Sequence, residues 1–362
     1  MNPVRIAWFI SPHGFGHAAR ACAVMEQLFA LDHTLLFDVY TLVPEWFFTD
    51  SLSCPFTFHP HETDIGLVQT SPLHEDIPAT IDRLQTFMDF SPQRLQPLVQ
   101  KIVSCQTCFV ISDISPLGLA VANAADVPSI LIENFTWDWI YEGYIAIDSR
   151  MRYFSKEMRT IFDLADYHIQ TEPVCRSSAA DLVVPPVSRS PRLSVVETRM
   201  RLNIGSFVPA VLFSMTTIPV DFFEHILRYP ELSFIIPARE VTSIQHHQNC
   251  ILIPVNASMY HPDLVAAVNV VVGKVGYSTL AETFNAGVAY GYLPRKHFRE
   301  SLPLVDFITS SMNAQALAEE DLTSGRWIDK VLPLCSNTVT PRFSRNGVFR
   351  AAEYIMNLVH SP

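Results

Sequence analysis

The sequence predicts an α/β protein made of two halves of similar size, each with a parallel sheet covered by helices. Short apolar runs such as "VRIAWFI" alternate with longer stretches of helical spacing such as "HAARACAVMEQLFAL". The runs are mostly apolar, which is typical of strands buried on both faces. After a proline-rich polar interruption at 181–194, which we interpret as a linker, the same alternation begins again.

The first half contains a series of strand candidates in chain order. The first two are "VRIAWFI" and "TLLFDVYTLV", and the later ones are "TFHP", "CFVISD", "SILIEN" and "YHIQT". Helical spacing between these runs predicts helices at 78–104, 116–125 and 151–163. This order of elements predicts a first Rossmann-like domain at 1–187.

The second half repeats the plan. Its strand candidates are "AVLFSM", "LSFIIPA", "CILIPV", "VNVVVG" and "VAYGYL", and its helices include "PVDFFEHILRY" and "YSTLAETFNAG". We therefore expect a second Rossmann-like domain at 194–345. The remaining residues, 346–362, contain an amphipathic helix with an Asn-Gly start signal, which we expect to pack back on the first domain.

Composition excludes several classes of partner. The chain has 362 residues, which suggests two domains, and a net charge of -11 without any run of lysine or arginine, which argues against nucleic acid. It contains no run of about eighteen apolar residues, so no transmembrane segment is expected. Its seven cysteines are odd in number and scattered, which favours reduced thiols and the cytoplasm. No heptad pattern predicts an oligomer.

A glycine pair follows the first predicted strand, in "SPHGFGHAAR". Gly14 and Gly16 would let the backbone approach a ligand closely at the start of a helix. The segment from Gly14 to Ala19 also satisfies the G-x-G-x-x-G/A pattern of dinucleotide-binding proteins. That pattern requires an acidic residue at the tip of the second strand, and neither Asp38, inside the strand, nor Glu45, beyond it, fits well.

A histidine and an aspartate lie where the first sheet is expected to bind ligands. His17 stands in the first turn of the helix after the first strand, where an imidazole is suited to remove a proton from a hydroxyl. Asp113 ends the strand candidate "CFVISD" at the same edge of the sheet, so it is the best candidate to orient His17. The alternative is that His17 only caps or packs the helix.

A second glycine loop lies in "VNVVVGKVGYSTLAETFNAG". A strand ends at Gly273, the turn contains Gly276, and Ser278 and Thr279 open a helix whose free N–H groups and hydroxyls would surround a phosphate. Glu282, one turn further on, would hold ribose hydroxyls. The alternative for Glu282 is a favourable charge near a helix N-terminus without any ligand. A P-loop is excluded because the required upstream glycine is missing.

Taken together, these blocks resemble those of a known enzyme family. "HGFGHAAR", "GKVGYSTLAETFNAGVAYGYLPR", the block at 112–144 and "FRESLP" are similar to GT-B glycosyltransferases of the MurG and UDP-sugar transferase type. The resemblance is closest to the glycosyltransferase-like N-terminal region of plant L-arabinokinases and its stand-alone bacterial relatives. It implies two Rossmann-like domains facing across a cleft, with a nucleoside-diphosphate sugar bound mainly by the C-terminal domain and an acceptor by the N-terminal domain.

The resemblance also implies roles for individual residues. Transfer would be inverting, independent of metal and without a cofactor, with His17 as the general base and Asp113 as its orienting group. Thr216 would supply a hydroxyl where similar enzymes have a glycine-rich turn. The positions implied for the donor are Gly14, Gly16, Thr216, Gly273, Gly276, Tyr277, Ser278, Thr279, Glu282 and Glu300, and those for the acceptor are His13, Phe15, Trp137 and Trp139.

Three alternatives stay open at this point. In "FTWDWIYEGY", Trp137 and Trp139 at alternating positions of an extended segment would form an acceptor wall or, as we favour, a packing surface. The histidines and acids of "HPHETD" do not have the spacing of a known metal site, so no metal is expected. The chain as a whole would be a transferase, a sugar-nucleotide-binding module without activity, or, least favoured, a nucleotide-sugar epimerase.

Overall fold

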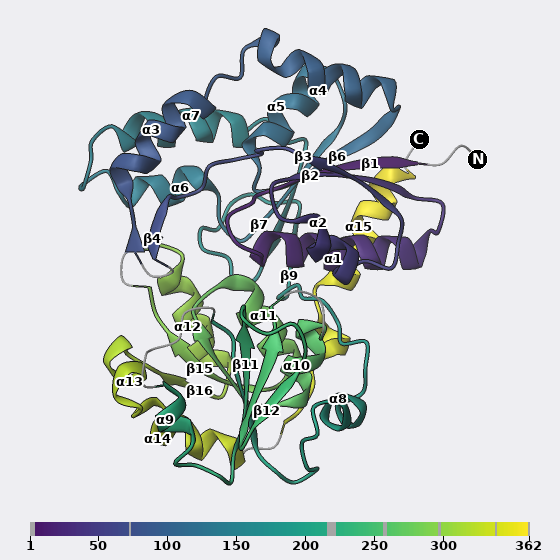
Figure 1. Ribbon diagram of the computed structural model, residues 1–362. Helices are drawn as coiled ribbons and strands as arrows, with labels where there is room; N and C mark the ends of the chain where they lie inside the picture. Colours follow the sequence, from purple (N-terminus) through teal and green to yellow (C-terminus); the bar gives the residue numbers. More distant parts are fainter. Residues whose placement is uncertain are drawn as a thin grey trace. The chain divides into compact units, whose positions relative to one another are not determined.

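The structure is a computed structural model that describes residues 4–71, 74–215, 222–255, 259–295, 298–336 and 339–360. It divides into two compact units (Figure 1). Unit 1 comprises residues 1–187, 297–300 and 347–362, and unit 2 comprises residues 188–296 and 301–346. Each unit contains one large sheet with helices on both faces, so the predicted α/β class is confirmed.

The sheet of unit 1 has the order β3-β2-β1-β6-β7-β8-β9, and all of its neighbouring strands are parallel. A separate antiparallel pair is formed by β4 (Gln69–Ser71) and β5 (His74–Glu75). The strands of the large sheet are β1 (Arg5–Ile10), β2 (Leu36–Thr41), β3 (Phe56–Pro60), β6 (Thr107–Asp113), β7 (Ser129–Glu133), β8 (Tyr167–Thr171) and β9 (Leu182–Val184).

Two hydrophobic cores lie on the two faces of this sheet because side chains alternate along each strand. Ile6 and Trp8 of β1 point into one core, whereas Ala7 and Phe9 point into the other. The first core is covered by α1 (Gly16–Leu31), α2 (Glu45–Ser51) and α15 (Val348–Val359). The second is covered by α3 (Ile77–Phe87), α4 (Pro92–Ser104), α5 (Pro116–Ala125), α6 (Trp137–Glu142) and α7 (Met151–Phe162).

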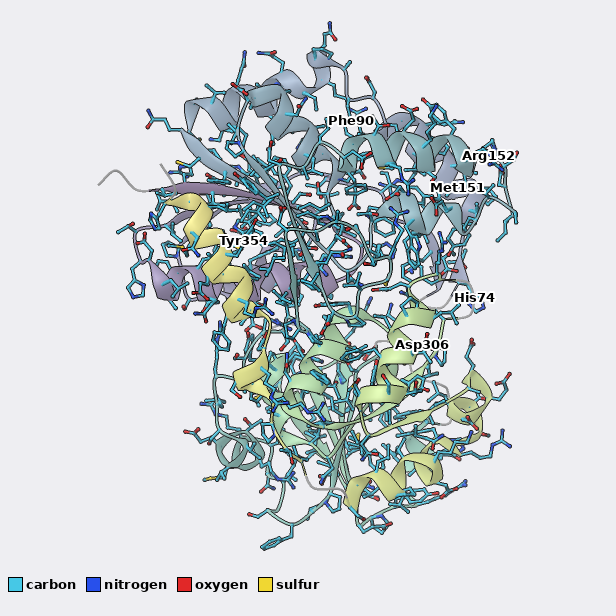
Figure 2. All side chains as sticks on the ribbon, turned by 180° about the vertical axis from the view of Figure 1, so that it is seen from behind. His74, Phe90, Met151, Arg152, Asp306 and Tyr354 are labelled. Atoms are coloured by element: carbon cyan, nitrogen blue, oxygen red, sulfur yellow. The ribbon has the colours of Figure 1, made fainter. Side chains whose placement is uncertain are left out.

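The last helix of the chain, α15, is part of unit 1 and packs against α1. Its residues Ala351 and Ile355 are fully buried in the same core as Ala18 and Met25 of α1. Tyr354, labelled on this helix in Figure 2, lies at the margin of that core.

Two predicted elements of unit 1 differ from the structure. The interruption at 181–194 is not a linker throughout, because Leu182–Val184 forms β9 at the edge of the sheet. The predicted helix at 78–104 is two helices, since Asp76 caps α3 and a new helix begins with Pro92 in its first turn.

The sheet of unit 2 has the order β12-β13-β11-β10-β14-β15-β16, with only the edge strand β12 antiparallel. Its strands are β10 (Ala210–Phe213), β11 (Ser233–Ala238), β12 (Gln245–His247), β13 (Cys250–Pro254), β14 (Val270–Lys274), β15 (Ala289–Leu293) and β16 (Ala314–Ala316). One face is covered by α10 (His261–Ala267), α11 (Tyr277–Ala286) and α12 (Ser301–Ser311), and the other by α9 (Phe222–Ile226), α13 (Glu319–Ser324) and α14 (Trp327–Val331). The remaining helices are α8 (Val195–Arg201), η1 (Leu332–Ser336) and η2 (Phe343–Arg345).

Each sheet has one point at which the strand order reverses. In unit 1 the chain runs outward from β1 through β2 to β3 and then returns to place β6 beside β1. In unit 2 it runs from β10 through β11 to β13 and then returns to place β14 beside β10. Open parallel sheets bind ligands at the carboxyl ends of the strands at such a reversal. The topology therefore points to two places, the β1/β6 edge and the β10/β14 edge.

Within the described residues, no helix is both long enough and apolar enough to cross a lipid bilayer.

Candidate active site

The β1/β6 edge of unit 1 brings His17 and Asp113 together. Asp113 is the last residue of β6 and pairs in register with Ile10, the last residue of β1. The chain then turns through Gly14, whose φ of 75° is in the left-handed region, and α1 begins at Gly16. This turn places the His17 ring at the sheet edge, where its Nδ1 lies 2.9 Å from Oδ1 of Asp113.

Arg20, one helical turn after His17, fixes Asp113 from a second side. Its Nε donates to Oδ2 of Asp113 at 2.8 Å, and its Nη2 donates to Oδ1 at 2.6 Å. Burial alone would raise the pKa of Asp113, but the charge of Arg20 and the hydrogen bonds from Arg20 and His17 outweigh burial and lower it. The carboxylate is therefore ionised at neutral pH and accepts the Nδ1–H of His17, which leaves Nε2 of the neutral ring able to take a proton.

A further set of buried polar residues extends from Arg20. Its Nη1 donates to Oδ1 of Asn134 at 2.9 Å and to the hydroxyl of Thr171 at 3.2 Å. Asn134 in turn donates through Nδ2 to Oε1 of Glu300 at 2.9 Å. Glu300 was expected from the sequence near the donor sugar, whereas in the structure it belongs to unit 1 and is buried there. Its role toward a donor stays a prediction.

Sequence reasoning missed Arg20, Asn134 and Thr171. The signal available for Arg20 was its spacing of three from His17, which puts both on one face of α1. Asn134 and Thr171 directly follow or end the strands β7 and β8, so they lie at the same sheet edge as Asp113. Nothing in the sequence indicates which residues at this edge contact Arg20.

The residues predicted for the acceptor side have different surroundings. The His13 ring lies edge-on to Trp137, with centroids 5.1 Å apart, and stacks near Phe298. Phe15 is 44% exposed at the start of α1 and stacks on Phe47. Of these residues, Phe15 presents the most apolar surface for a ligand.

The prediction that Trp137 and Trp139 lie on an extended segment is wrong, because residues 137–142 form the helix α6. The alternation argument fails since helical side chains do not alternate in direction. Both rings are buried in the second core of unit 1, so their burial supports the packing alternative. The Trp137 indole donates to Oδ2 of Asp64 at 3.1 Å, and Arg299 lies over the Trp139 ring at 4.4 Å.

Asp64 is a second buried carboxyl group near Asp113. Burial raises its pKa to about 7, although hydrogen bonds from Ser11 and Trp137 lower it in part. Its Oδ1 has no hydrogen-bond partner among the described residues. In the sequence Asp64 stands out only as part of "HPHETD", and no three histidine, cysteine or acidic side chains gather as a metal site in the described ranges. Asp64 is thus a titratable group beside the His17 site.

The β10/β14 edge of unit 2 contains the second glycine loop. A Cβ on Gly273 would lie 3.3 Å from the carbonyl oxygen of Ser214, so this glycine permits close packing of the two strand ends. A Cβ on Gly276 would meet nothing within 4 Å, so the backbone there faces open space. Gly276 is the N-cap of α11, whose first residues are Tyr277, which is buried, and the half-buried Ser278 and Thr279. The backbone N–H groups at the N-terminus of a helix are suited to a phosphate.

Glu282, predicted to hold a ribose, is buried in unit 2 and bound to the side chains of Arg189 and His261. Arg189 donates to Oε1 through Nε at 3.0 Å and through Nη2 at 2.9 Å, and Nδ1 of His261 lies 2.6 Å from Oε2. Burial would raise the pKa of Glu282, but the charges of Arg189 and His261 outweigh it and lower the pKa. Neither partner was predicted from the sequence. Thr216, the remaining donor candidate, lies outside the described residues.

One known protein resembles most of this chain in sequence. No family model matches the chain. An L-arabinokinase from Arabidopsis thaliana is 27% identical over 328 residues, which cover 89% of this chain and 31% of that protein. The chain therefore spans about a third of the length of this relative.

Solved structures match along almost the whole chain. The glycotransferase of kitacinnamycin superposes with a TM-score of 0.63 at 15% identity, covering 99% of both chains. The fold is GT-B. The spinosyn forosaminyltransferase SpnP gives a TM-score of 0.62 at 13% identity, covering 99% of this chain and 100% of that one. UGT89C1 of Arabidopsis thaliana, solved with UDP-L-rhamnose, gives 0.62 at 12% identity, covering 99% and 95%. The GT-B fold expected from the sequence blocks is confirmed.

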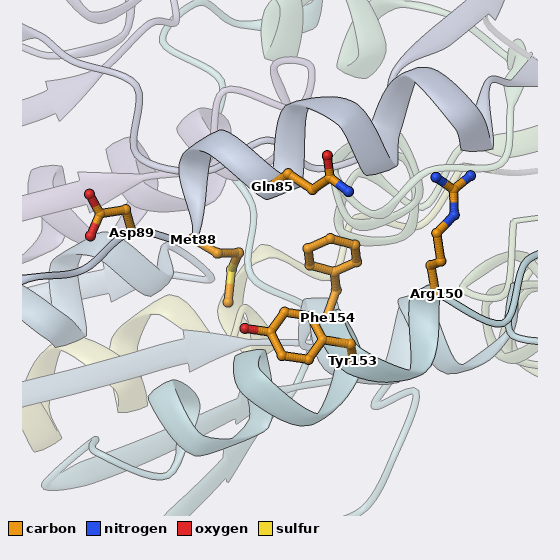
Figure 3. A pocket seen from close by; sticks show the side chains of 6 residues that line it. All are labelled: Gln85, Met88, Asp89, Arg150, Tyr153 and Phe154. Carbon is orange, nitrogen blue, oxygen red and sulfur yellow. The ribbon is translucent and has the colours of Figure 1, made fainter.

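Unit 1 also contains two surface hollows. One, of about 420 Å³, is lined by side chains of α3 and α7 and by residues next to them, and Figure 3 shows Tyr153 and Phe154 facing Met88 across it. The other, of about 410 Å³, lies along β7 and β8. Neither is lined by His17 or Asp113, so neither is part of the candidate active site.

Proposed function

We propose that this GT-B protein transfers a glycosyl group from a nucleoside-diphosphate sugar to an acceptor hydroxyl, with inversion and without a metal. The observation that carries the proposal is the buried pair of His17 and Asp113 at the strand reversal of unit 1. Its Nδ1 to Oδ1 distance of 2.9 Å is that of a base held by an orienting carboxylate.

In the proposed reaction, Nε2 of His17 takes the proton of the acceptor hydroxyl. The acceptor oxygen attacks the anomeric carbon from the face opposite the diphosphate, and the bond between that carbon and the diphosphate oxygen breaks. The electron pair leaves with the nucleoside diphosphate, and a single displacement of this kind inverts the anomeric configuration. The imidazolium that forms on His17 is stabilised by Asp113, which Arg20 keeps ionised.

The donor side of the proposal rests on the glycine loop of unit 2. The α11 N-terminus offers backbone N–H groups and the hydroxyls of Ser278 and Thr279 to a diphosphate, and the open space at Gly276 gives access to them. One structure of the same fold, that of UGT89C1, is a complex with UDP-L-rhamnose, which supports a sugar nucleotide as the donor class.

Product analysis tests the proposal. The purified protein is incubated with UDP-, GDP-, ADP- and TDP-sugars and a panel of phenolic and sugar acceptors, with and without EDTA. We expect one donor to give a glycosylated product whose anomeric coupling constant shows inversion, at a rate that EDTA does not change. Retention of configuration or loss of activity in EDTA would contradict the mechanism, and absence of product with every donor would contradict the function.

A binding module without activity is the second candidate. Burial of Glu282 against Arg189 and His261 favours it, because the carboxylate expected on the donor is already engaged. This candidate predicts saturable binding of a sugar nucleotide without release of nucleoside diphosphate.

All seven cysteines are free thiols, which fits a reducing compartment, and we propose the cytoplasm for either function.

A further inference from the structure

Four side chains of unit 2 form a continuous hydrogen-bonded chain at the β10/β14 edge. The Ser214 hydroxyl lies 3.1 Å from Nε2 of His261, and Nδ1 of the same ring lies 2.6 Å from Oε2 of Glu282. Arg189 binds the other carboxylate oxygen of Glu282 with two N–H groups. This series of hydrogen bonds therefore connects the buried guanidinium of Arg189 to the Ser214 hydroxyl at the end of β10.

This arrangement fixes the orientation of the His261 ring. A carboxylate has no proton to donate, so Nδ1 of His261 must carry the hydrogen that bonds to Glu282. Nε2 then faces Ser214, which donates to the neutral ring or accepts from the protonated one. The Glu282 carboxylate thus orients the His261 ring, and the ring in turn orients the Ser214 hydroxyl.

The carboxylate is poorly placed to act on a ribose. The Glu282 side chain is only 3% exposed and that of Arg189 only 6%. A ribose hydroxyl would have to compete with two N–H groups on Oε1 and with the 2.6 Å contact on Oε2. If Glu282 turned away, Arg189 would lose a buried counter-charge, which is strongly unfavourable.

The Ser214 end of this series of hydrogen bonds, in contrast, lies where a phosphate is expected. Ser214 follows the last residue of β10, and its Cβ and carbonyl oxygen contact the Gly273 position of β14. Gly276, the N-cap of α11, lies three residues after Gly273. The His261 side chain is 30% exposed and Ser214 is half-buried, so both can reach a ligand at this edge.

We propose that Glu282 is a positioning residue, which holds His261 and Ser214 toward the donor diphosphate, and that it does not bind the donor ribose. The proposal rests on the proposed function, because it assigns the ligand of the same donor site. Its consequence is a specificity: the protein binds 2′-deoxyribonucleoside diphosphates as tightly as the corresponding ribonucleoside diphosphates.

Calorimetric titration of the full chain with UDP and dUDP, GDP and dGDP, and ADP and dADP tests this specificity. A hydrogen bond from a ribose hydroxyl to a carboxylate changes Kd by about ten- to a hundredfold. For the base that binds, we expect the two Kd values to agree within about threefold, well below that range. A deoxy form weaker by tenfold or more, with the difference abolished in Glu282→Gln, would overturn the proposal while leaving the proposed function intact. Absence of binding by all six and by TDP would overturn both.

Three variants test the positioning role. His261→Ala and Ser214→Ala remove groups that face the phosphate, so each is expected to weaken the ribo and deoxy forms by the same factor. Glu282→Gln is also expected to weaken the binding of both forms by the same factor. In addition, it should change the ¹⁵N shifts of the His261 ring, whereas substitution of a structural residue remote from the ring would leave these shifts unchanged. Asp306→Asn, an exposed carboxylate on α12 of the same unit (Figure 2), is the matched control and is expected to change neither quantity. Unchanged ring shifts in Glu282→Gln would contradict the positioning role.

Discussion

Replacement of Asp64 by asparagine is expected to stabilise the protein in a pH-dependent way. The asparagine side chain would keep the shape of the aspartate and its acceptor for the Trp137 indole, but would remove the ionisable group. In the native structure burial raises the pKa of Asp64 from 3.8 to about 7. The folded state therefore retains the Asp64 proton over a pH range in which the unfolded chain has released it.

The magnitude follows from this difference in pKa. Between 3.8 and about 7 lie about three pKa units, and at 1.36 kcal/mol for each unit they amount to about 4 kcal/mol. The stability contributed by the protonated group is complete below about pH 4, is lost as the pH rises toward 7 and stays lost above it. The advantage of Asp64→Asn over the native protein is therefore expected to grow by about 4 kcal/mol from about pH 4 to about pH 8.

Urea unfolding of both proteins at a series of pH values measures this advantage directly. The difference between the two free energies of unfolding isolates Asp64, because every other titrating group is common to both proteins. A difference independent of pH, or one that shrinks as the pH rises, would refute the reasoning and would mean that Asp64 is ionised in the folded state at neutral pH.

Two further predictions concern stability and donor binding. Arg20→Met leaves Asp113 buried without its counter-charge and is expected to lower the free energy of unfolding by about 3–5 kcal/mol. In the double variant Arg20→Met/Asp113→Asn, part of that loss should be restored. If the losses from the two substitutions were additive, the pairing of Arg20 with Asp113 would be contradicted. In Gly287→Ala the new methyl group would clash with the backbone of Thr340, and the φ of 70° disfavours alanine, so the free energy of unfolding should fall by at least about 1–3 kcal/mol. In Gly276→Ala the methyl group lies in open space at an extended φ. This variant should therefore keep the stability of the native protein but bind nucleoside diphosphates more weakly. Equal unfolding midpoints for the two alanine variants, or unaltered binding by Gly276→Ala, would contradict these assignments.

The sequence predicts most strands because their apolar runs are buried on both faces, and it predicts His17 and Asp113 as neighbours for a related reason. Asp113 ends a strand and His17 stands in the first turn of the helix that follows a strand, and the carboxyl ends of parallel strands meet at one edge. Position relative to a strand end is encoded locally, even though 96 residues separate the two side chains.

The partners of buried charges were not predictable in this way. Arginine side chains are usually exposed, whereas Arg20 is buried and bonded to Asn134 and Thr171, which lie at the ends of strands distant in the sequence. Glu282 lies at the distance from the glycine loop expected of a residue that binds the donor. Its carboxylate is bound instead by Arg189 and His261, which lie 93 and 21 residues away in the sequence. Helix α6 was missed because its alternating aromatic residues also fit an extended segment.

The most direct test of the proposed role of His17 compares the native protein with His17→Gln under identical conditions. The measured quantities are the rate of nucleoside-diphosphate release with an acceptor present and the Kd of the donor nucleotide. His33→Gln, an exposed histidine of the same unit, is the matched control. Loss of a general base predicts that His17→Gln is slower by about 10²–10⁴-fold, with an unchanged donor Kd and a native rate in the control. Equal release rates for the native protein and His17→Gln would contradict the proposed mechanism.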